Sequence, residues 1–413
     1  RITSAGQIAG TVYYIAPEVA LGLEYDGRAD LYALGVMLYE LTTGRLPFEA
    51  EDPLAVITQH IHAPALPPRA RNADIPLALD DLILCWLSKN PFDRPANAAQ
   101  VLQTLEAPEI LEREAALNEE VSVLERIARG SLVGRGKELS EARNLWNRTL
   151  SGQGQMLLVS GEPGVGKTRL VREISTGVQI SGGRVLSGAC YAEGGVPYTP
   201  FIQILRSALE ECAIKDLNLP DNVLVDLINL LPDLQTHFPH ILSREILDDP
   251  SNAQHRLFES LLLVFNGLSE RYALLLVVED IHWGDSGSLH LLRHLARNTR
   301  SQNIMIATTF RDVIPLEAEV FHEMLLDLRR EGLTVHLKIP RLNRAQCGEM
   351  LGILFAEEIT AEFLDSIYDE TEGNPFYIEE VCKALVESGK VSYSSGRWHR
   401  PSVGELGIPQ SVR

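Results

Sequence analysis

Eight consecutive residues carry the pattern G-x-x-x-x-G-K-[ST], which suits the binding of a phosphate chain. They are Gly161, Glu162, Pro163, Gly164, Val165, Gly166, Lys167 and Thr168. Two of the glycines let successive backbone N–H groups curl around a β-phosphate, and a helix beginning near Lys167 turns its positive dipole end toward the same anion. Lys167 would bridge the β- and γ-phosphates, and the Thr168 hydroxyl would hold Mg²⁺. The pattern predicts a nucleoside triphosphate with Mg²⁺ as the ligand.

Two adjacent acids, Glu279 and Asp280, end a short apolar run over residues 274–278. Buried parallel strands have this composition, and their carboxyl ends face the ligand crevice of an α/β sheet. Carboxylates at that edge coordinate Mg²⁺ through water and orient the attacking water. The common pattern has Asp where this chain has Glu279. The sequence therefore leaves open which of the two acids binds the metal.

Length and composition bound the class of protein. The 413 residues are enough for two or three domains, and 45% hydrophobic with 23% charged residues is ordinary for a globular protein. The net charge of −19 argues against a nucleic-acid-binding surface, because phosphate backbones are bound by clustered Lys and Arg. No apolar run reaches about twenty residues, so we expect a cytoplasmic protein without a membrane span.

Cysteines and histidines show no metal-binding pattern. The five cysteines form no C-x-x-C pair, which predicts buried thiols in a reducing compartment. The close pairs His60 with His62, and His237 with His240, lack a third ligand. We expect surface histidines at these positions.

Several short motifs follow one another in the first hundred residues. They are Gly10-Thr11, Ala16-Pro17-Glu18, Asp30-Leu31-Tyr32-Ala33-Leu34-Gly35, Gly44-Arg45-Leu46-Pro47-Phe48 and Asn90-Pro91-Phe92-Asp93-Arg94-Pro95. In this order they resemble the end of the activation segment and the C-terminal lobe of a Ser/Thr protein kinase. The resemblance implies a buried ion pair between Glu18 and Arg94, whose disruption would cost about 3–5 kcal/mol. It also implies that Asp30 caps the catalytic-loop backbone and that Thr11 meets the catalytic aspartate.

The phosphoryl-transfer residues of that family would all precede Arg1. These are the Gly-rich loop, the ATP-pairing lysine, the H-R-D loop and the D-F-G aspartate. The resemblance therefore implies that the chain as printed keeps structural and substrate-docking parts of a kinase. Thr3 and Ser4 fall where activation-loop phosphorylation would occur.

A second set of motifs surrounds the phosphate-binding pattern. Leu132-Val133-Gly134-Arg135 precedes it, Ile281-His282-Trp283-Gly284-Asp285 follows the two acids, a short apolar run over residues 304–307 leads into Thr308-Thr309-Phe310-Arg311, and Gly373-Asn374-Pro375-Phe376 comes last. This order resembles the signal-transduction ATPases with numerous domains, a branch of the AAA-related P-loop proteins. The resemblance implies that Val133 and Arg135 lie against adenine and ribose. It also implies that Thr308 or Thr309 bonds the γ-phosphate or attacking water, that Arg311 reads the γ-phosphate charge, and that Pro375 touches the nucleotide from a helical lid.

These patterns predict a multidomain chain in five segments. A mainly α kinase C-terminal lobe (residues 1–105) is followed by a helical linker (106–130), an α/β P-loop ATPase domain with a parallel sheet and flanking helices (131–340), and a helical lid (341–390). Residues 391–413 begin with a hairpin-like segment and resemble the start of a winged helix. Because the chain begins at Arg1 rather than Met and ends within such a segment, we expect a fragment of a longer polypeptide.

The expected parent is a cytoplasmic signalling Ser/Thr kinase fused to a switch that binds and hydrolyses ATP. ATP and Mg²⁺ are the expected cofactors, and protein substrates of the kinase are the expected partners. Self-association through the ATPase stays open. One alternative is an AAA ATPase of the origin-recognition type that binds DNA, against which the acidic charge and the kinase motifs count. Another is a non-catalytic scaffold with a pseudokinase, which intact Lys167 and Thr168 disfavour for the ATPase.

Overall fold

The computed structural model describes residues 12–50, 53–72, 75–105, 132–192, 196–211, 217, 219–241, 250–312, 319–355, 359–388, 390–394 and 397–399. The chain divides into two compact units, one formed by Arg135–Pro340 and the other by Arg1–Gly134 with Arg341–Arg413. Thr3, Ser4, Thr11, the predicted linker over residues 106–130 and residues 400–413 of the predicted winged-helix region lie outside the described residues.

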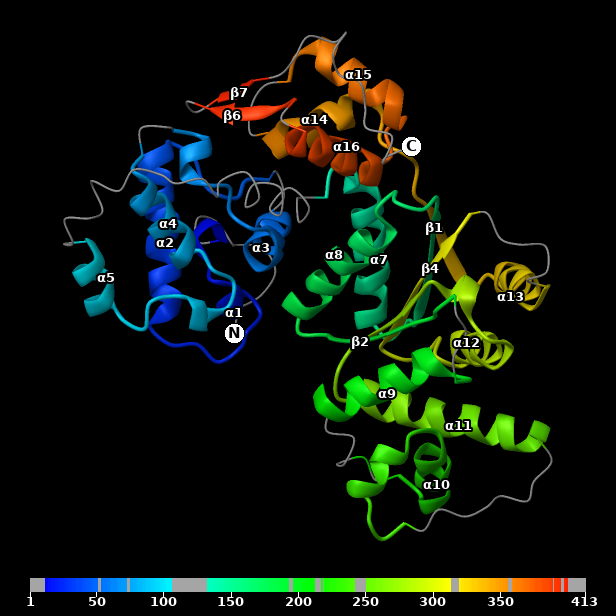
Figure 1. Cartoon of the computed structure of the whole chain (residues 1–413). Helices are drawn as coiled ribbons and strands as arrows, with labels where there is room; N and C mark the ends of the chain where they lie inside the picture. Colours follow the sequence, from blue (N-terminus) through cyan, green and yellow to red (C-terminus); the bar gives the residue numbers. More distant parts are fainter. Residues whose placement is uncertain are drawn as a thin grey trace. The chain divides into compact units, whose positions relative to one another are not determined.

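A five-stranded parallel sheet forms the centre of the unit Arg135–Pro340 (Figure 1). The strand order is β2-β3-β4-β1-β5. The central strands are almost wholly buried apolar runs, as expected for a parallel sheet covered on both faces. The strands are β1 (Gln155–Gly161), β2 (Arg184–Ala189), β3 (Leu274–Glu279), β4 (Ile304–Arg311) and β5 (Thr334–Lys338). Because β4 lies between β1 and β3, the phosphate-loop strand and the strand that ends in the acids are not direct neighbours.

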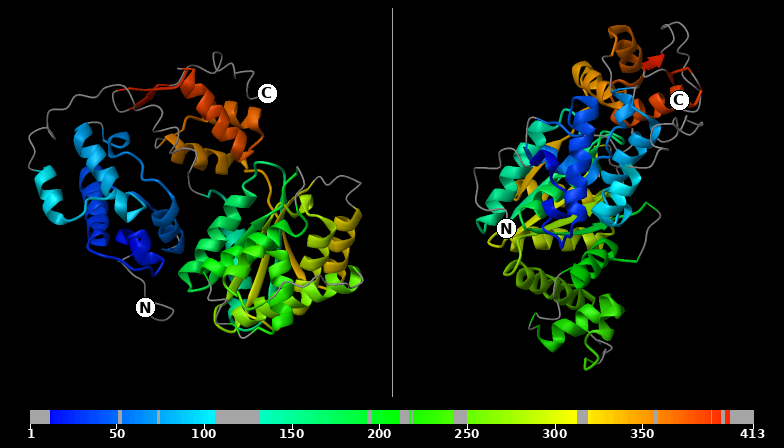
Figure 2. Two further views of the ribbon diagram at one scale, coloured as in Figure 1. Left: turned by 60° about the horizontal axis from the view of Figure 1, so that its bottom comes forward. Right: turned by 90° about the vertical axis from the view of Figure 1, so that its left-hand side faces the viewer.

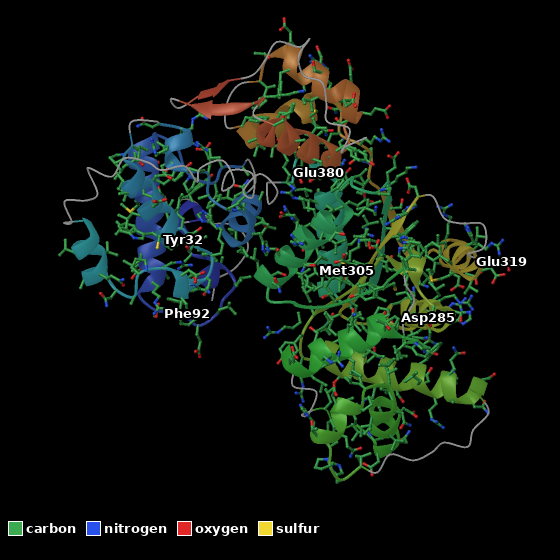
Figure 3. All side chains as sticks on the ribbon, viewed as in Figure 1. Tyr32, Phe92, Asp285, Met305, Glu319 and Glu380 are labelled. Carbon is green, nitrogen blue, oxygen red and sulfur yellow. The ribbon has the colours of Figure 1, made fainter. Side chains whose placement is uncertain are left out.

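Helices cover both faces of this sheet (Figures 1 and 2). One face carries α7 (Gly136–Leu150) and α8 (Lys167–Ile180), and the other carries α12 (Ser286–Asn298) and α13 (Glu319–Arg330). Alternate residues of each strand enter each layer, so Leu274 and Leu276 join the core with the second pair of helices. Met305, the second residue of β4, is fully buried (Figure 3). The predicted parallel sheet with flanking helices is confirmed.

A helical extension follows β2. It consists of α9 (Thr199–Glu211), α10 (Asp221–Leu230), the short η6 (Pro232–Thr236) and α11 (Pro250–Ser269), and it shares one apolar core with the sheet. The buried carboxylate of Asp226 accepts hydrogen bonds from Arg256 Nε at 3.0 Å and from Ser260 Oγ at 3.0 Å. These hydrogen bonds hold α10 against α11.

The described residues between 12 and 105 form a small helical assembly. Its elements are η1 (Val12–Tyr14), α1 (Pro17–Ala20), α2 (Arg28–Thr43), α3 (Pro53–His62), η2 (Pro68–Ala70), α4 (Leu77–Trp86), η3 (Pro91–Asp93) and α5 (Ala98–Leu105). Helix α2 is central, since Tyr32, Val36 and Tyr39 on one of its faces are fully buried. It ends at Gly44, whose φ of 71° is the left-handed cap that glycine adopts without steric cost.

Residues after Arg341 form a separate apolar cluster from three helices, α14 (Arg344–Phe355), α15 (Ala361–Thr371) and α16 (Pro375–Glu387). Asn374 caps α16 by accepting a hydrogen bond from the backbone N–H of Phe376, and Pro375 occupies the first helical position. An antiparallel hairpin of β6 (Ser392–Ser394) and β7 (Arg397–His399) follows, where the hairpin-like segment was expected.

Candidate functional site

The loop between β1 and α8 has the backbone that its glycines predict. Gly164 has a φ of 83° and Gly166 has a φ of 97°, both in the left-handed region where a side chain is strained. At Gly161 a Cβ atom would lie 2.8 Å from the carbonyl oxygen of Ile339 and 2.9 Å from Val165 Cγ2. Helix α8 then begins at Lys167, and the first N–H groups of a helix, which have no partner within the helix, are a place where anions bind.

Lys167 lies inside this loop and is only 8% exposed. Its Nζ donates hydrogen bonds to the carbonyl oxygens of Gly161 at 3.0 Å and Glu162 at 2.9 Å. Burial lowers the pKa of Lys167, while the charge of Asp280 opposes that shift and the charge of Arg311 adds to it. The ammonium group therefore shares its surroundings with an acid from the end of β3 and with the arginine at the end of β4.

The two predicted acids have different surroundings. Glu279 Oε2 accepts a hydrogen bond from Thr168 Oγ1 at 3.2 Å, although 111 residues separate them in the chain. Burial raises the pKa of Glu279, the hydrogen bond from Thr168 opposes this, and the charge of Asp280 raises it further. The carboxylate is thus desolvated and next to a like charge, an environment that a bound cation would offset.

Asp280 adopts a left-handed backbone conformation with a φ of 51°. Its backbone N–H donates to Thr309 Oγ1 on β4 at 2.9 Å. Thr308 is fully buried in β4, and its hydroxyl has no hydrogen-bond partner among the described residues. Of the two threonines, Thr309 is the one that contacts the acid pair.

Oxygen donors of this kind fit Mg²⁺. The Thr168 hydroxyl and the Glu279 carboxylate are hard ligands, and Mg²⁺ is usually held by one or two such groups together with substrate phosphates. In the part of the chain that the structure describes, no group of three or more His, Cys, Asp or Glu side chains is placed to hold a metal by itself. Mg²⁺ held by these two groups would take its remaining ligands from phosphate oxygens and water.

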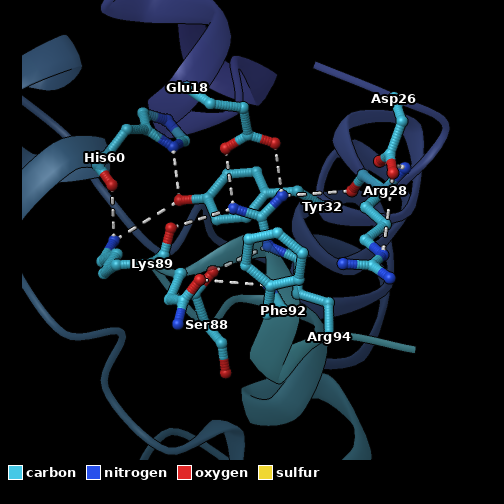
Figure 4. Close-up of polar contacts among 10 residues, drawn as sticks. Glu18, Asp26, Arg28, Tyr32, His60, Ser88, Lys89, Phe92 and Arg94 are labelled. Atoms are coloured by element: carbon cyan, nitrogen blue, oxygen red, sulfur yellow. Dashed lines mark hydrogen bonds and ion pairs between the residues drawn. The ribbon is translucent and has the colours of Figure 1, made fainter. Parts of the chain in front are cut away.

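In the other unit, Glu18 and Arg94 form the implied buried pair (Figure 4). Arg94 Nη1 donates to Glu18 Oε1 at 2.7 Å and Nη2 donates to Oε2 at 2.9 Å, and the residues are 4% and 5% exposed. The guanidinium group also donates to the carbonyl oxygens of Ser88, Arg28 and Lys89. It lies over the ring of Tyr32, 4.7 Å from the ring centroid. One side chain thus ties together α1, the start of α2 and the turn after α4.

Comparison with known proteins finds two families, one for the segment that contains the buried ion pair and one for the domain that contains the phosphate-binding loop. Residues 2–105 match the protein kinase domain family, and residues 131–307 match the AAA ATPase domain family. The chain joins a protein-kinase segment to an AAA-type P-loop ATPase domain. The match with the kinase family covers the segment that contains the Glu18–Arg94 pair, and the match with the AAA family covers the phosphate-binding loop and the two acids.

The kinase segment is similar to bacterial Ser/Thr kinases. It is 39% identical over 104 residues to a probable serine/threonine-protein kinase of Clostridium acetobutylicum, covering 25% of this chain and 16% of the relative. It is 46% identical over 108 residues to the serine/threonine-protein kinase pkn3 of Myxococcus xanthus, covering 26% of this chain and 20% of the relative. The chain therefore spans at most a fifth of the length of these two kinases. A solved structure of the Aeropyrum pernix ORC2 protein aligns at a TM-score of 0.40 and 15% identity over 67% of each chain.

Arg135 of the ATPase domain is buried, at 3% exposed. Its Nη2 donates to the carbonyl oxygen of Pro340 at 2.6 Å and to that of Val165 at 3.3 Å. Burial lowers its pKa. Arg135 thus connects the phosphate-binding loop at Val165 to the segment that follows β5 at Pro340. Its implied contact with adenine and ribose stays a prediction.

The remaining predicted residues have these places. Val133 packs in the apolar cluster of the α14–α16 helices, and Pro375 begins α16. Arg311 is exposed at the end of β4, with its guanidinium carbon 5.8 Å from the ring centroid of Trp283. Asp30 is exposed in the first turn of α2 in the kinase segment.

Two expectations about single residues are wrong. His60 is fully buried, not at the surface, because α3 turns it toward α2, where its Nδ1 lies 2.9 Å from the hydroxyl of Tyr32. Cys85 is exposed rather than buried, since it lies on the outer side of α4. Both depend on which face of a helix packs inward, and short helices such as α3 and α4 have too few turns for the sequence to fix that face.

His282 was missed as a site residue. Its side chain is 2% exposed, and its Nδ1 lies 3.9 Å from Asp280 Oδ1. The sequence signal was its position two residues after the acid pair, within a stretch that matched the family without an assigned role.

Among the described residues, no helix is both long and apolar enough to cross a membrane.

Proposed function

We propose that the ATPase domain binds ATP with Mg²⁺ and hydrolyses it slowly, as a regulatory switch in a signalling Ser/Thr kinase. The observation that carries this proposal is the hydrogen bond from Thr168 to Glu279 beside Lys167. It brings the loop of β1 and the acid of β3 together at the carboxyl edge of the sheet, where α/β proteins bind their ligands.

The same contact suggests how the two acids divide the work. Glu279 accepts the Thr168 hydroxyl, so we assign it to the metal side of the site. Asp280 is held through its backbone by Thr309, lies near the His282 ring and faces the charge of Lys167. We assign Asp280 to orienting the attacking water, with the Thr309 hydroxyl beside it.

Lys167 would change partners when phosphate binds. Its ammonium group now donates to two carbonyl oxygens of its own loop, Gly161 O and Glu162 O. Phosphate oxygens carry more charge than carbonyl oxygens and make stronger hydrogen bonds with an ammonium group. Bound Mg²⁺ would supply charge neutralisation at the phosphates, and Arg311 would add a second positive charge on the γ-phosphate side.

The contacts of Arg135 support a switch. The unit Arg135–Pro340 contains the phosphate-binding loop. The chain enters this unit at Arg135 and leaves it after Pro340. Arg135 bonds to Pro340 at the exit and to Val165 in the phosphate-binding loop. A change in the loop on nucleotide binding would therefore act through Arg135 on both the entry and the exit of this unit. We propose that the population of a closed state of the helical lid, which contains Pro375, would shift as a result.

Nucleotide titration tests the proposal. A ribose-labelled fluorescent ATP (mant-ATP) with Mg²⁺ should bind the wild-type chain, and Lys167→Met should weaken binding by at least about 100-fold, as loss of a charge-assisted contact to phosphate does. Lys137→Met is the matched control, because Lys137 is exposed in the first turn of α7. Equal binding by wild type and Lys167→Met, or absence of binding by both, would refute the proposal.

We further propose that the complete parent polypeptide phosphorylates Ser or Thr on protein substrates, with this kinase segment forming the docking side. The similarity to two Ser/Thr kinases and the Glu18–Arg94 pair support this. Transfer of labelled phosphate to a generic protein substrate by the complete polypeptide carrying Lys167→Met would test it, since that variant removes hydrolysis by the ATPase domain. A parent that transfers no phosphate would leave only the switch.

A further inference from the structure

His282 is a buried imidazole with an unusual set of neighbours. Its side chain is 2% exposed, and neither ring nitrogen has a hydrogen-bond partner among the described residues. Buried polar groups nearly always have a partner, and leaving one without costs about 1–3 kcal/mol. A histidine kept only for packing would be replaced by an apolar side chain without that cost. The position therefore points to a task that needs a ring nitrogen.

The charged groups that act on the ring belong to the candidate nucleotide site. Nδ1 lies 3.9 Å from Asp280 Oδ1, and the charges of Arg311 and Lys167 also act on the imidazole. The ring of Trp283 lies beside it, with the two centroids 5.0 Å apart. Burial lowers the pKa of His282, Asp280 opposes this, and Arg311 and Lys167 reinforce it. The imidazole is thus neutral near pH 7 and has one N–H to donate.

Asp280 needs such a partner. Its backbone is fixed, because the residue is in the left-handed region and its N–H is bonded to Thr309. Its side chain is 43% exposed, and its Oδ1 lies 3.9 Å from His282 Nδ1. A distance of 3.9 Å is too long for a hydrogen bond, but a small rotation of either side chain would close it to about 2.9 Å.

We propose that His282 is a positioning residue that fixes the Asp280 carboxylate, by donating its Nδ1–H to Asp280 when nucleotide is bound. This inference rests on the proposed function of the ATPase domain. It assigns to His282 an effect on the hydrolytic step and none on ground-state nucleotide binding, because the ring acts through Asp280, which the proposed function assigns to the attacking water and not to the phosphates.

Two substitutions separate positioning from packing. His282→Leu keeps an apolar side chain of comparable size and removes the N–H. His282→Asn keeps an N–H donor close to the position of Nδ1, although it fills less space. If the ring only packs, leucine is the milder change; if it positions Asp280, asparagine is. The order of the two variants therefore tests the inference.

The measurements are the single-turnover rate of ATP hydrolysis, the Kd of mant-ATP with Mg²⁺, and the Kd of mant-ADP with aluminium fluoride, a mimic of the transferring phosphoryl group. For His282→Leu we expect hydrolysis to slow by about 10- to 100-fold and the fluoride complex to weaken by a similar factor. The Kd of mant-ATP should stay within about twofold of wild type. His282→Asn should recover most of the rate.

Three results would overturn the inference. They are a rate for His282→Leu within about twofold of wild type, a loss of mant-ATP binding as large as the loss of rate, or a slower rate for asparagine than for leucine. Failure of the wild-type chain to bind mant-ATP would instead overturn the proposed function, and this inference with it.

Discussion

Glu18→Gln in the kinase segment offers a direct test of the buried ion pair. The substitution keeps the size of the side chain and removes its charge, so the Arg94 guanidinium group remains buried without a counter-charge. Removing one partner of such a pair costs about 3–5 kcal/mol. The structure favours that range, since both residues are no more than 5% exposed and two hydrogen bonds of 2.7 and 2.9 Å join them.

Hydrogen exchange of the whole chain, followed by mass spectrometry, measures this loss within the kinase segment. Peptides from α2 report the free energy of local opening, and each 1.36 kcal/mol corresponds to a tenfold change in exchange rate. The backbone amides of α2 should therefore exchange about 150 to 5,000 times faster in Glu18→Gln. Arg94→Leu should be at least as damaging, because three backbone carbonyl oxygens lose their donors along with Glu18.

Asp26→Asn is the matched control. Asp26 lies 3.8 Å from Arg28 Nε, but its side chain is 65% exposed, and such pairs contribute about 0–1 kcal/mol. Asparagine still accepts the hydrogen bond from the Arg28 backbone N–H. Exchange in α2 should change by less than about fivefold. The reasoning fails if Glu18→Gln and Asp26→Asn have equal effects on α2.

Two further predictions concern a buried histidine and a crowded glycine. Burial and the charge of Lys89 lower the pKa of His60 to about 3, so the unfolded state binds more protons between that value and pH 6.5, and stability is lost as the pH falls through this window. Between pH 7 and pH 5 the protection of the α3 amides against hydrogen exchange should fall by about 2 kcal/mol, which is about 30-fold in the pH-corrected exchange rate. His60→Gln should abolish this fall. An equal pH dependence in the variant would contradict the prediction. Gly161→Ala should lower the melting temperature and prevent mant-ATP binding, because its Cβ would lie 2.8 Å from the carbonyl oxygen of Ile339. Gly136→Ala is the control and should change neither, because no atom lies within 4 Å of its Cβ position. Wild-type affinity of Gly161→Ala for mant-ATP would contradict the prediction.

Much of the ATPase domain followed from local pattern. The residues from Gly161 to Thr168 determine their own backbone, because glycine torsions and the start of a helix are set by neighbouring residues. The strand before Glu279 was also predicted from local pattern, since the core strands of a parallel sheet are short apolar runs. The Glu18–Arg94 pair came from a resemblance to a family and not from local pattern, as 76 residues separate its members.

The tertiary structure decided what depends on distant residues. Order and register in the sheet place Glu279, and not Asp280, against Thr168, which no count along the sequence reveals. The burial of His282 beside Asp280 and the contacts of Arg135 with Pro340 arise only when β1, β3, β4 and β5 lie side by side. The sequence by itself determined the backbone of the phosphate-binding loop, because its glycine torsions and the hydrogen bonds of Lys167 to Gly161 and Glu162 arise within consecutive residues. Folding determined the division of work around that loop, because it depends on side chains that meet across strands.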